Sequence, residues 1–295
     1  MKRKVIKLGS NSLLVSLPSA WAKKHNIRKG DEISLEEKDG TIVLSGSSAP
    51  ATASASIDIT DLKAIVKRAL GALYKKGYDE FTVQFSNHDE LEAAYEVIRE
   101  EFTGFEIVQH GKNHLVAREI SQPHADQFDT VLRRQFLVIK DFAGEVSSAL
   151  AGKDTAWLKR LVLRDKDVNK LADFCRRIIN KQHGSPGLYL IVEQLEKISD
   201  RYRDISAYAA ETKLAPSKAL LAAAGKVNAY LDEFYHCFYQ FSLPAVNAFV
   251  ARRKELLAEL QKLRVSPQEQ RILFLLEDIV GKTYDLNGAL LALRL

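Results

Sequence analysis

The spacing of apolar and polar residues divides the chain into a strand-rich start, a mixed middle and a long helical end. In residues 1–46, short apolar runs alternate with polar residues at the period of two that is typical of half-buried strands. The predicted order is strand, strand, helix, strand, strand, over Lys4–Leu8, Ser12–Leu17, Pro18–His25, Glu32–Glu36 and Thr41–Leu44. A core this small is marginal in one chain, so we expect dimerisation to complete it.

A run of small, uncharged residues from Gly46 to Ser56 predicts a linker, which we place at residues 47–56. Residues 57–120 mix both periodicities and predict a small α/β module. Its helices are expected at Asp61–Lys75 and Asp89–Glu101, and its strands at Glu80–Phe85, Phe105–Gln109 and Leu115–Arg118. The module has neither a phosphate-binding glycine loop nor a nucleophile elbow. We interpret it as a spacer or dimer contact, with a ligand pocket as the alternative.

In the region 121–295, the chain has helical period from Asp126 onward. Breaks containing Pro, Gly and Ser divide this region into six helices of roughly 20–28 residues joined by short loops, a pattern typical of antiparallel bundles. The last helix has a marked start, because Ser266 and Glu269 can form a capping box. The segment Leu195–Ile205 recurs as Leu276–Leu286, in the third helix of each half, which predicts two three-helix repeats. The expected fold class is therefore α+β, mostly α.

Charge is concentrated at the start of the chain. The first thirty residues carry eight Lys and Arg and no Asp or Glu. Residues 1–46 hold nine basic and five acidic residues, so they contribute +4 of the chain's net charge of +5. A local basic excess on a folded segment is typical of a polyanion-binding surface, and a solubilising surface is the alternative. We expect this surface to bind double-stranded DNA, with affinity that falls as salt rises.

The remaining composition excludes other classes of protein. A hydrophobic content of 46% with 27% charged residues is globular. Two cysteines, Cys175 and Cys237, are too few for a disulfide framework and suit a reducing compartment. With no membrane-length apolar run and no signal peptide, we expect a cytoplasmic protein that is not itself a membrane protein. No nucleophile has an identifiable base partner, so we expect no enzymatic activity. Aromatic residues between Tyr230 and Phe241 have the helical spacing of a core, with a partner groove as the alternative.

Three motifs connect the basic segment with a known family. They are Arg3-Lys4-Val5-Ile6-Lys7-Leu8-Gly9, Leu14-Val15-Ser16-Leu17-Pro18 and Ile27-Arg28-Lys29-Gly30-Asp31-Glu32-Ile33. Together they cover nearly all of residues 1–46, which resemble the AbrB/SpoVT/MazE swapped-hairpin domain. The resemblance implies an interlaced homodimer whose basic residues contact DNA.

The candidate DNA-contacting residues follow from the charge and from this resemblance. Arg3, Lys4 and Lys23 fall where family members place DNA contacts. The loop after Gly9 departs from the basic loop of AbrB, but its polar groups can still contact phosphate or a base edge. The full set is Lys2, Arg3, Lys4, Lys7, Ser10, Asn11, Ser12, Lys23 and Lys24.

A second candidate site consists of oxygen-bearing side chains on two predicted helices. Glu196 and Asp200 are four residues apart and share a helix face, and Asp165 and Asn169 repeat this spacing one helix earlier. Packed antiparallel, the helices could direct all four side chains at one divalent cation or iron. Acids at this spacing are more commonly a solvated face.

The motif Leu195-Glu196-Lys197-Ile198-Ser199-Asp200 resembles the third helix of PhoU, a family of phosphate-signalling proteins. The resemblance covers about residues 121–295 and implies two three-helix repeats, with metal held by E/D-xxx-D pairs in some members. This chain departs from the pattern at Asn169, and at Gly281, which takes the place of Asp200 in the second repeat. We therefore expect at most one metal site.

The segment Ile98–Val108 also looks like the middle region of archaeal-type proteins that join an AbrB-like domain to a PhoU-like one. The combination predicts a homodimeric DNA-binding transcriptional regulator of phosphate uptake, with a sensory or partner-binding helical region. The alternative is an adaptor that does not bind DNA and instead regulates a phosphate transporter component or a signalling kinase.

Overall fold

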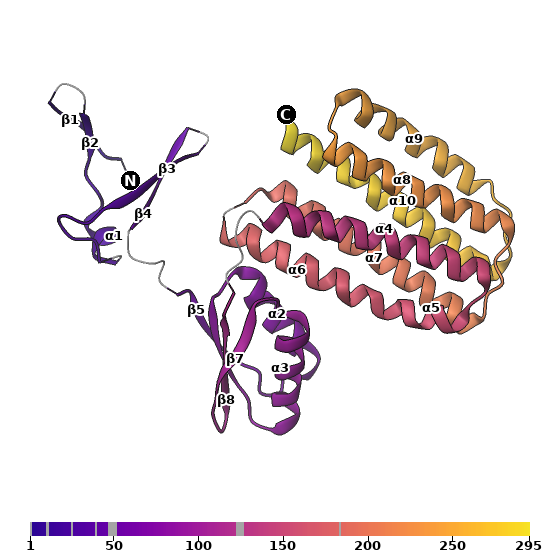
Figure 1. Ribbon diagram of the computed structural model, residues 1–295, viewed down its shortest axis with the longest axis horizontal. Coiled ribbons are helices and arrows are strands. Elements are labelled where there is room, and N and C mark those ends of the chain that lie inside the picture. The colour runs from indigo at the N-terminus through magenta and orange to yellow at the C-terminus, as the bar shows by residue number, and fades with distance from the viewer. Residues whose placement is uncertain are drawn as a thin grey trace. The chain divides into compact units, whose positions relative to one another are not determined.

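The computed structural model describes residues 2–9, 12–24, 26–38, 40–46, 52–121, 127–182 and 184–295 (Figure 1). They belong to two units, Met1–Ala53 and Ser54–Leu295. The predicted fold class, α+β and mostly α, is confirmed.

The first unit, which we call the head, is built from two antiparallel hairpins, and its predicted element order is confirmed. Each hairpin is a separate two-stranded sheet, and the first turns at Gly9, whose φ of 68° is left-handed backbone that favours glycine. The elements are β1 (Val5–Leu8), β2 (Ser12–Val15), α1 (Ser19–Lys24), β3 (Ile33–Lys38) and β4 (Thr41–Gly46).

Within its described residues, the head has no buried side chain. Nine of its large apolar side chains are between 38% and 71% exposed. They are Val5, Ile6, Leu8, Leu13, Leu14, Val15, Leu35, Ile42 and Leu44. An isolated two-stranded hairpin is marginal in water, and apolar faces of this extent mark an interaction surface.

The second unit begins with a four-stranded sheet in the order β5-β6-β8-β7. The pair β5/β6 is parallel and the other two pairs are antiparallel. Side chains of the two helices and of one sheet face form the core, including Leu70, Ile98, Phe81 and Leu115, all fully buried. The elements are β5 (Ser54–Asp58), a 3-10 turn η1 (Lys63–Ile65), α2 (Val66–Lys76), β6 (Glu80–Gln84), α3 (His88–Glu101), β7 (Phe105–His110) and β8 (His114–Glu119).

Strand β5 corrects the predicted linker. We placed residues 47–56 in a linker, but Ser54, Ala55 and Ser56 pair with Glu80, Phe81 and Thr82 of β6. Small, uncharged residues suit both a linker and a strand, and here pairing with a distant strand decides between them. The start of the unit at Ser54 agrees with this pairing.

Glu90 joins the start of α3 to the loop that follows β5. The backbone N–H of Ser86 and that of Asp61 donate to the Glu90 carboxylate at 2.7 and 2.8 Å. These hydrogen bonds lower the pKa of Glu90 to about 2, and the one from the Ser86 N–H has the largest effect. A lowered pKa stabilises the fold above the ordinary carboxyl pKa, and this stabilisation is lost as pH falls towards 2.

We expect Glu90→Gln to lower the melting temperature at pH 7, with a difference from wild type that shrinks as pH falls from about 4.5 towards 2. The measurement is the melting temperature of both proteins across this pH range. Glu92→Gln is the matched control, because Glu92 lies on the same helix and is 70% exposed. A difference for Glu90→Gln that is constant with pH would contradict the assignment.

The rest of the unit consists of long helices. They are α4 (Gln127–Gly152), α5 (Thr155–Leu161), a 3-10 turn η2 (Val162–Arg164), α6 (Asp165–Lys181), α7 (Pro186–Thr212), α8 (Lys218–Tyr239), α9 (Leu243–Gln261) and α10 (Pro267–Arg294). The predicted capping box at Ser266 and Glu269 is confirmed. The second of the six predicted helices is instead two helices, α5 and α6, joined by η2. No proline or glycine marks this break, so the sequence offers no signal for it.

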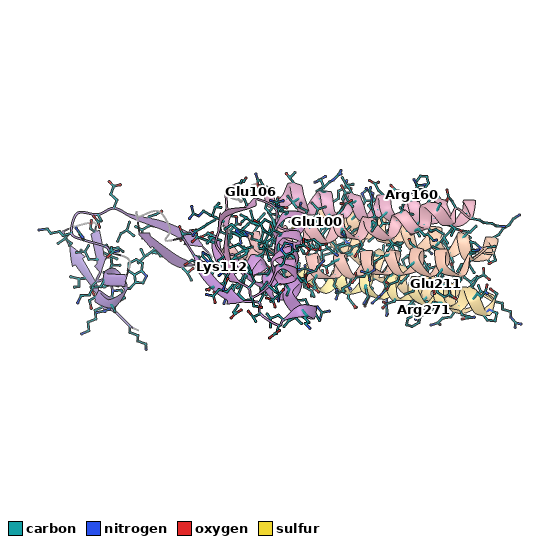
Figure 2. The ribbon with its side chains drawn as sticks, turned by 90° about the horizontal axis from the view of Figure 1, so that it is seen from below. Glu100, Glu106, Lys112, Arg160, Glu211 and Arg271 are labelled. Carbon is teal, nitrogen blue, oxygen red and sulfur yellow. The ribbon has the colours of Figure 1, made fainter. Side chains whose placement is uncertain are left out.

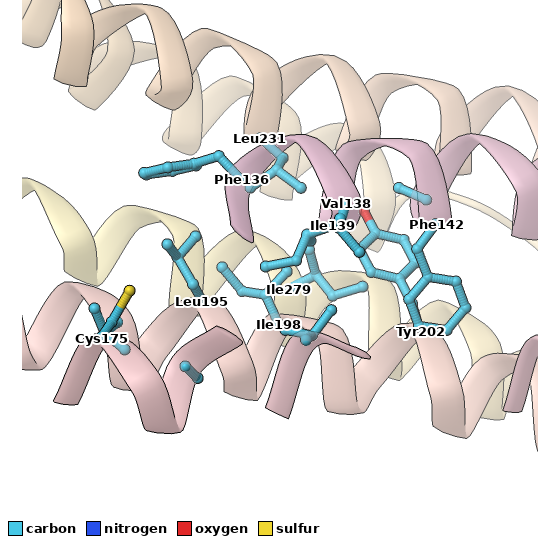
Figure 3. Close-up of a cluster of buried hydrophobic side chains, with 14 of the residues drawn as sticks. Phe136, Val138, Ile139, Phe142, Cys175, Leu195, Ile198, Tyr202, Leu231 and Ile279 are labelled. Atoms are coloured by element: carbon cyan, nitrogen blue, oxygen red, sulfur yellow. The ribbon is translucent and has the colours of Figure 1, made fainter. Parts of the chain in front are cut away.

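The internal repeat lies in α7 and α10, which pack side by side. Equivalent apolar positions are buried in both copies, with Leu195 and Ile198 corresponding to Leu276 and Ile279. Figure 3 shows Leu195, Ile198 and Ile279 in one cluster with Phe136 of α4. The two copies of the repeat therefore contribute equivalent positions to one shared core.

Candidate nucleic-acid interface and the predicted cation site

The basic side chains of the head are available to a ligand. Lys2, Arg3, Lys4, Lys7 and Lys23 are all exposed. Across the described part of the head, no carboxylate forms an ion pair with any of them. Their positive charge is therefore not neutralised within the described residues of the chain.

Four further candidates lie in or near the first hairpin and α1. Ser12 is exposed and pairs with Leu8 in the β1/β2 hairpin. Ser10 and Asn11 lie outside the described residues, as does the side chain of Lys24. That these three residues contact DNA therefore stays a prediction from the sequence.

The hairpin register shows how the basic and apolar groups share the strands. Lys7 lies opposite Leu13, and Val5 lies opposite Val15, so these four side chains share one face. Ile6 and its partner Leu14 occupy the other face. Both faces of the first hairpin therefore expose apolar groups.

Three residues of the predicted cation site lie close together, but a guanidinium lies between them. Arg203 Nη1 is 2.9 Å from Asp165 Oδ2 and 2.6 Å from Asp200 Oδ1. Asp165 is buried, and Ser199 Oγ donates to its other oxygen at 2.9 Å. The Asn169 amide donates to Asp165 at 3.2 Å, so it presents an N–H to this carboxylate.

Glu196, the fourth residue of the predicted site, belongs to a neighbouring ion-pair group. Arg176 of α6 is 3% exposed, and its Nη1 lies 2.6 Å from Glu196 Oε2 and 2.6 Å from Asp173 Oδ1. Lys197 Nζ lies 3.5 Å from Glu196 and 3.1 Å from Asp200, and so connects the two groups.

As the structure places them, these four residues do not fit a cation site. Each of the three carboxylates already contacts an Arg or Lys of this chain, and Arg203 takes the position between Asp165 and Asp200. No group of three or more His, Cys, Asp and Glu side chains in the described ranges is arranged to hold a metal ion. The sequence pattern identified the acids correctly but missed their basic partners. The signal for one partner was present, because Arg203 follows Asp200 by one helical turn.

We expect Arg203→Met to lower the free energy of unfolding by about 1–3 kcal/mol, since it leaves the buried Asp165 without its cation. Wild-type protein should melt at the same temperature with EDTA and with added Mn²⁺, because Asp165, Glu196 and Asp200 are each already paired with an Arg or Lys. Arg252→Met is the control, since Arg252 forms an exposed pair with Glu255. This would be contradicted if EDTA lowered the melting temperature of the wild type but not that of a variant lacking the carboxylates of Glu196 and Asp200.

A third set of ion pairs, missed by sequence reasoning, joins α6 to the α/β module. Arg177 is fully buried, and its Nη2 lies 3.0 Å from Glu119 Oε1 at the end of β8. Lys181 Nζ lies 2.7 Å from the other oxygen of Glu119. Lys166 pairs with Glu100, a residue labelled in Figure 2, at 3.4 Å. The sequence analysis did not single out Arg177, which packing of the module makes part of the core.

Both cysteines are buried and free, as their apolar sequence context suggested. Burial raises the pKa of Cys175 to about 12, so its thiol stays protonated and unreactive. Across the described residues, no helix combines the length and the hydropathy needed to cross a bilayer.

The head combines a two-hairpin β fold, unpaired basic side chains and apolar faces that one chain leaves uncovered. These features define a class of small basic β domains with an apolar surface that one chain leaves exposed. Residues 6–51 match the family "Antidote-toxin recognition MazE, bacterial antitoxin", so this segment is similar to MazE/AbrB-type antitoxin domains. Domains of this type typically bind DNA and dimerise, which points to a DNA-binding regulator or an antitoxin-type function. Neither a curated protein nor a solved structure matches the chain significantly.

Proposed function

We propose that the chain is a homodimeric, DNA-binding transcriptional regulator of phosphate uptake, with a PhoU-like helical region that senses state or binds a partner. The observation that carries the proposal is the MazE/AbrB-type head with its unpaired basic residues. Two copies of the head would present Arg3, Lys4 and Lys23 twice, on a surface that neutralises several phosphates of one duplex.

The exposed apolar side chains of the head support the homodimer. Leu35 lies opposite Leu44 and Ile42 lies opposite Glu37 in the β3/β4 hairpin, so the three apolar side chains share one face. An identical hairpin from a second chain would cover this face with equivalent groups, which is the geometry of a two-fold interface.

The duplication in the helical region supports the PhoU-like part of the proposal. In α7 and α10, Leu195 and Leu276 hold equivalent buried positions. Arg201 and Lys282, which are equivalent in the repeat, both contact Asp278, at 2.6 and 3.5 Å. Two three-helix halves that face each other in this way are what the PhoU resemblance implies. A phosphate transporter component or a signalling kinase remains the proposed partner class for this region.

The test is binding of the full chain to duplex DNA at 50 and 200 mM salt, followed by identification of the genomic fragments that it retains. We expect affinity to fall steeply with salt, and the retained fragments to lie upstream of phosphate-transport genes. The adaptor alternative predicts no measurable duplex binding even at 50 mM salt. Fragments from unrelated promoters would overturn the phosphate part of the proposal and leave DNA binding intact.

A further inference from the structure

One end of the helical region contains a cavity of about 340 Å³, within the size range of small-molecule sites. It lies where the starts of α4 and α7 meet the ends of α8 and α10. Figure 1 marks this end of α10 with the C-terminus. The lining residues are Asp129, Arg133, Leu188, Phe238, Tyr239, Leu293 and Arg294. Helices of both halves of the duplication therefore contribute to the cavity wall.

Arg133 is one of two arginines in the wall, and contacts with aromatic residues hold it in place. Its guanidinium carbon lies 4.0 Å from the centre of the Tyr239 ring, and its Nη1 is 3.5 Å from the Tyr235 hydroxyl. A guanidinium has five N–H donors, so these contacts leave most of them unused. A stacked arginine is also pre-organised to bind an anion.

Arg294, on α10 in the second half of the duplication, is also held by contacts with an aromatic residue. Its Nη2 donates to the Phe238 carbonyl at 3.1 Å, and its guanidinium carbon lies 5.8 Å from the Phe238 ring centre. Across the ranges that the structure describes, neither Arg133 nor Arg294 forms an ion pair, although Asp129 lines the same cavity. The two arginines outweigh Asp129, so the wall carries a net positive charge.

Tyr239 also lines the cavity, but its hydroxyl oxygen is not accessible from it as the structure stands. Its hydroxyl oxygen is buried and has no hydrogen-bond partner among the described residues. Burial raises the pKa of this hydroxyl, which therefore keeps its proton as a donor at neutral pH. Leu188 and Leu293 supply apolar surface next to the two arginines.

We propose that this cavity binds a small organic anion, with its carboxylate or phosphate group at Arg133 and Arg294 and its apolar body against Leu188, Leu293 and Phe238. Guanidinium groups bind both kinds of anion through charge-assisted hydrogen bonds, and the rings and leucines favour a ligand with an aromatic or aliphatic body. Because the wall includes both halves of the duplication, the bound ligand contacts both. This inference rests on the cavity alone and does not depend on DNA binding by the head.

The experiment is calorimetric titration of the full chain with phenyl phosphate, benzoate, inorganic phosphate and benzyl alcohol. We expect phenyl phosphate or benzoate to bind, and the tighter of the two identifies the anionic group. The double variant Arg133→Gln/Arg294→Gln should weaken this binding at least about tenfold, since charge-assisted bonds are lost. Leu188→Trp, which narrows the cavity and leaves both arginines intact, should weaken it as well.

Arg271→Gln is the matched control, because Arg271 of α10 also lies over an aromatic ring, that of Phe274 at 5.9 Å, but does not line this cavity. It should bind the tighter of phenyl phosphate and benzoate as wild type does. Binding of inorganic phosphate or benzyl alcohol as tight as that of the tighter of phenyl phosphate and benzoate would overturn the proposal. So would the absence of binding by every probe, or equal binding by wild type and the double variant.

Discussion

Reversing two charges in the head, with Arg3→Glu/Lys4→Glu, is expected to abolish binding of duplex DNA while the protein remains a dimer. Both side chains are exposed and unpaired within the described residues, so the substitution removes no internal contact that the structure shows. Each phosphate contact contributes about 0.9 to the slope of log affinity against log salt. Two residues in each of two chains make four contacts, so the milder Arg3→Gln/Lys4→Gln should reduce this slope by about 3–4.

The measurements are gel shift or fluorescence anisotropy across a salt series, with gel filtration to confirm the dimer. Lys159→Glu/Arg160→Glu is the matched control, because both residues are exposed on α5, and Arg160 is labelled in Figure 2. It makes the same change of charge away from the head and should leave binding nearly unchanged. If duplex binding survives the head substitution and is lost in the α5 control, the interface lies on the helical region instead.

Substitution of Arg177 by Met is expected to destabilise the second unit by about 3–5 kcal/mol, the cost of breaking one side of a buried ion pair. Arg177 is fully buried and Glu119 is 2% exposed, so neither charge can turn to water. Arg177 also donates to the Tyr74 carbonyl at 2.8 Å and lies over the Phe105 ring at 4.8 Å. After the substitution, Lys181 is the one basic side chain that remains within ion-pair distance of Glu119 among the described residues.

A double-mutant cycle separates the pair from the packing around it. Arg177→Met/Glu119→Gln should be less destabilised than Arg177→Met alone, because it no longer leaves a buried charge without its partner. Arg118→Met is the control, since Arg118 pairs with Glu80 at 2.6 Å but is 55% exposed, and it should cost at most about 1 kcal/mol. Chemical denaturation monitored by circular dichroism measures wild type, Arg177→Met, Glu119→Gln, the double variant and Arg118→Met. Equal stability of Arg177→Met and Arg118→Met would show that the buried pair does not stabilise the unit.

The Arg177 contacts change the interpretation of residues 57–120. The sequence suggested a module separate from residues 121–295, as a spacer or dimer contact. The structure instead joins both into one unit, with Arg177 and Lys181 of α6 bound to the end of β8. Arg177 and Lys181 therefore connect α6 to β8, which is joined to β5 through its pairing with β6.

The sequence by itself determined the elements and the character of the head. Alternating apolar residues, the glycine turns and the capping box at Ser266 are local signals, because hydrogen-bonding and side-chain period act over a few residues. The basic excess and the motifs of residues 1–46 were likewise readable without a structure. The repeat was visible because equivalent core positions in α7 and α10 need the same kind of side chain.

The tertiary structure decided which charges meet. Arg176 and Glu196 are distant in sequence, and only the packing of α6 against α7 brings them to 2.6 Å. Ser54, predicted to lie in the linker, belongs to a strand because it pairs with β6. Arg177 is buried because the α/β module packs against α6. The spacing of Glu196 and Asp200 specifies a shared helix face, but the neighbouring helix α6 decides whether Glu196 meets a second cation ligand or an arginine, and it supplies Arg176. That choice depends on contacts between distant segments, which local periodicity does not encode.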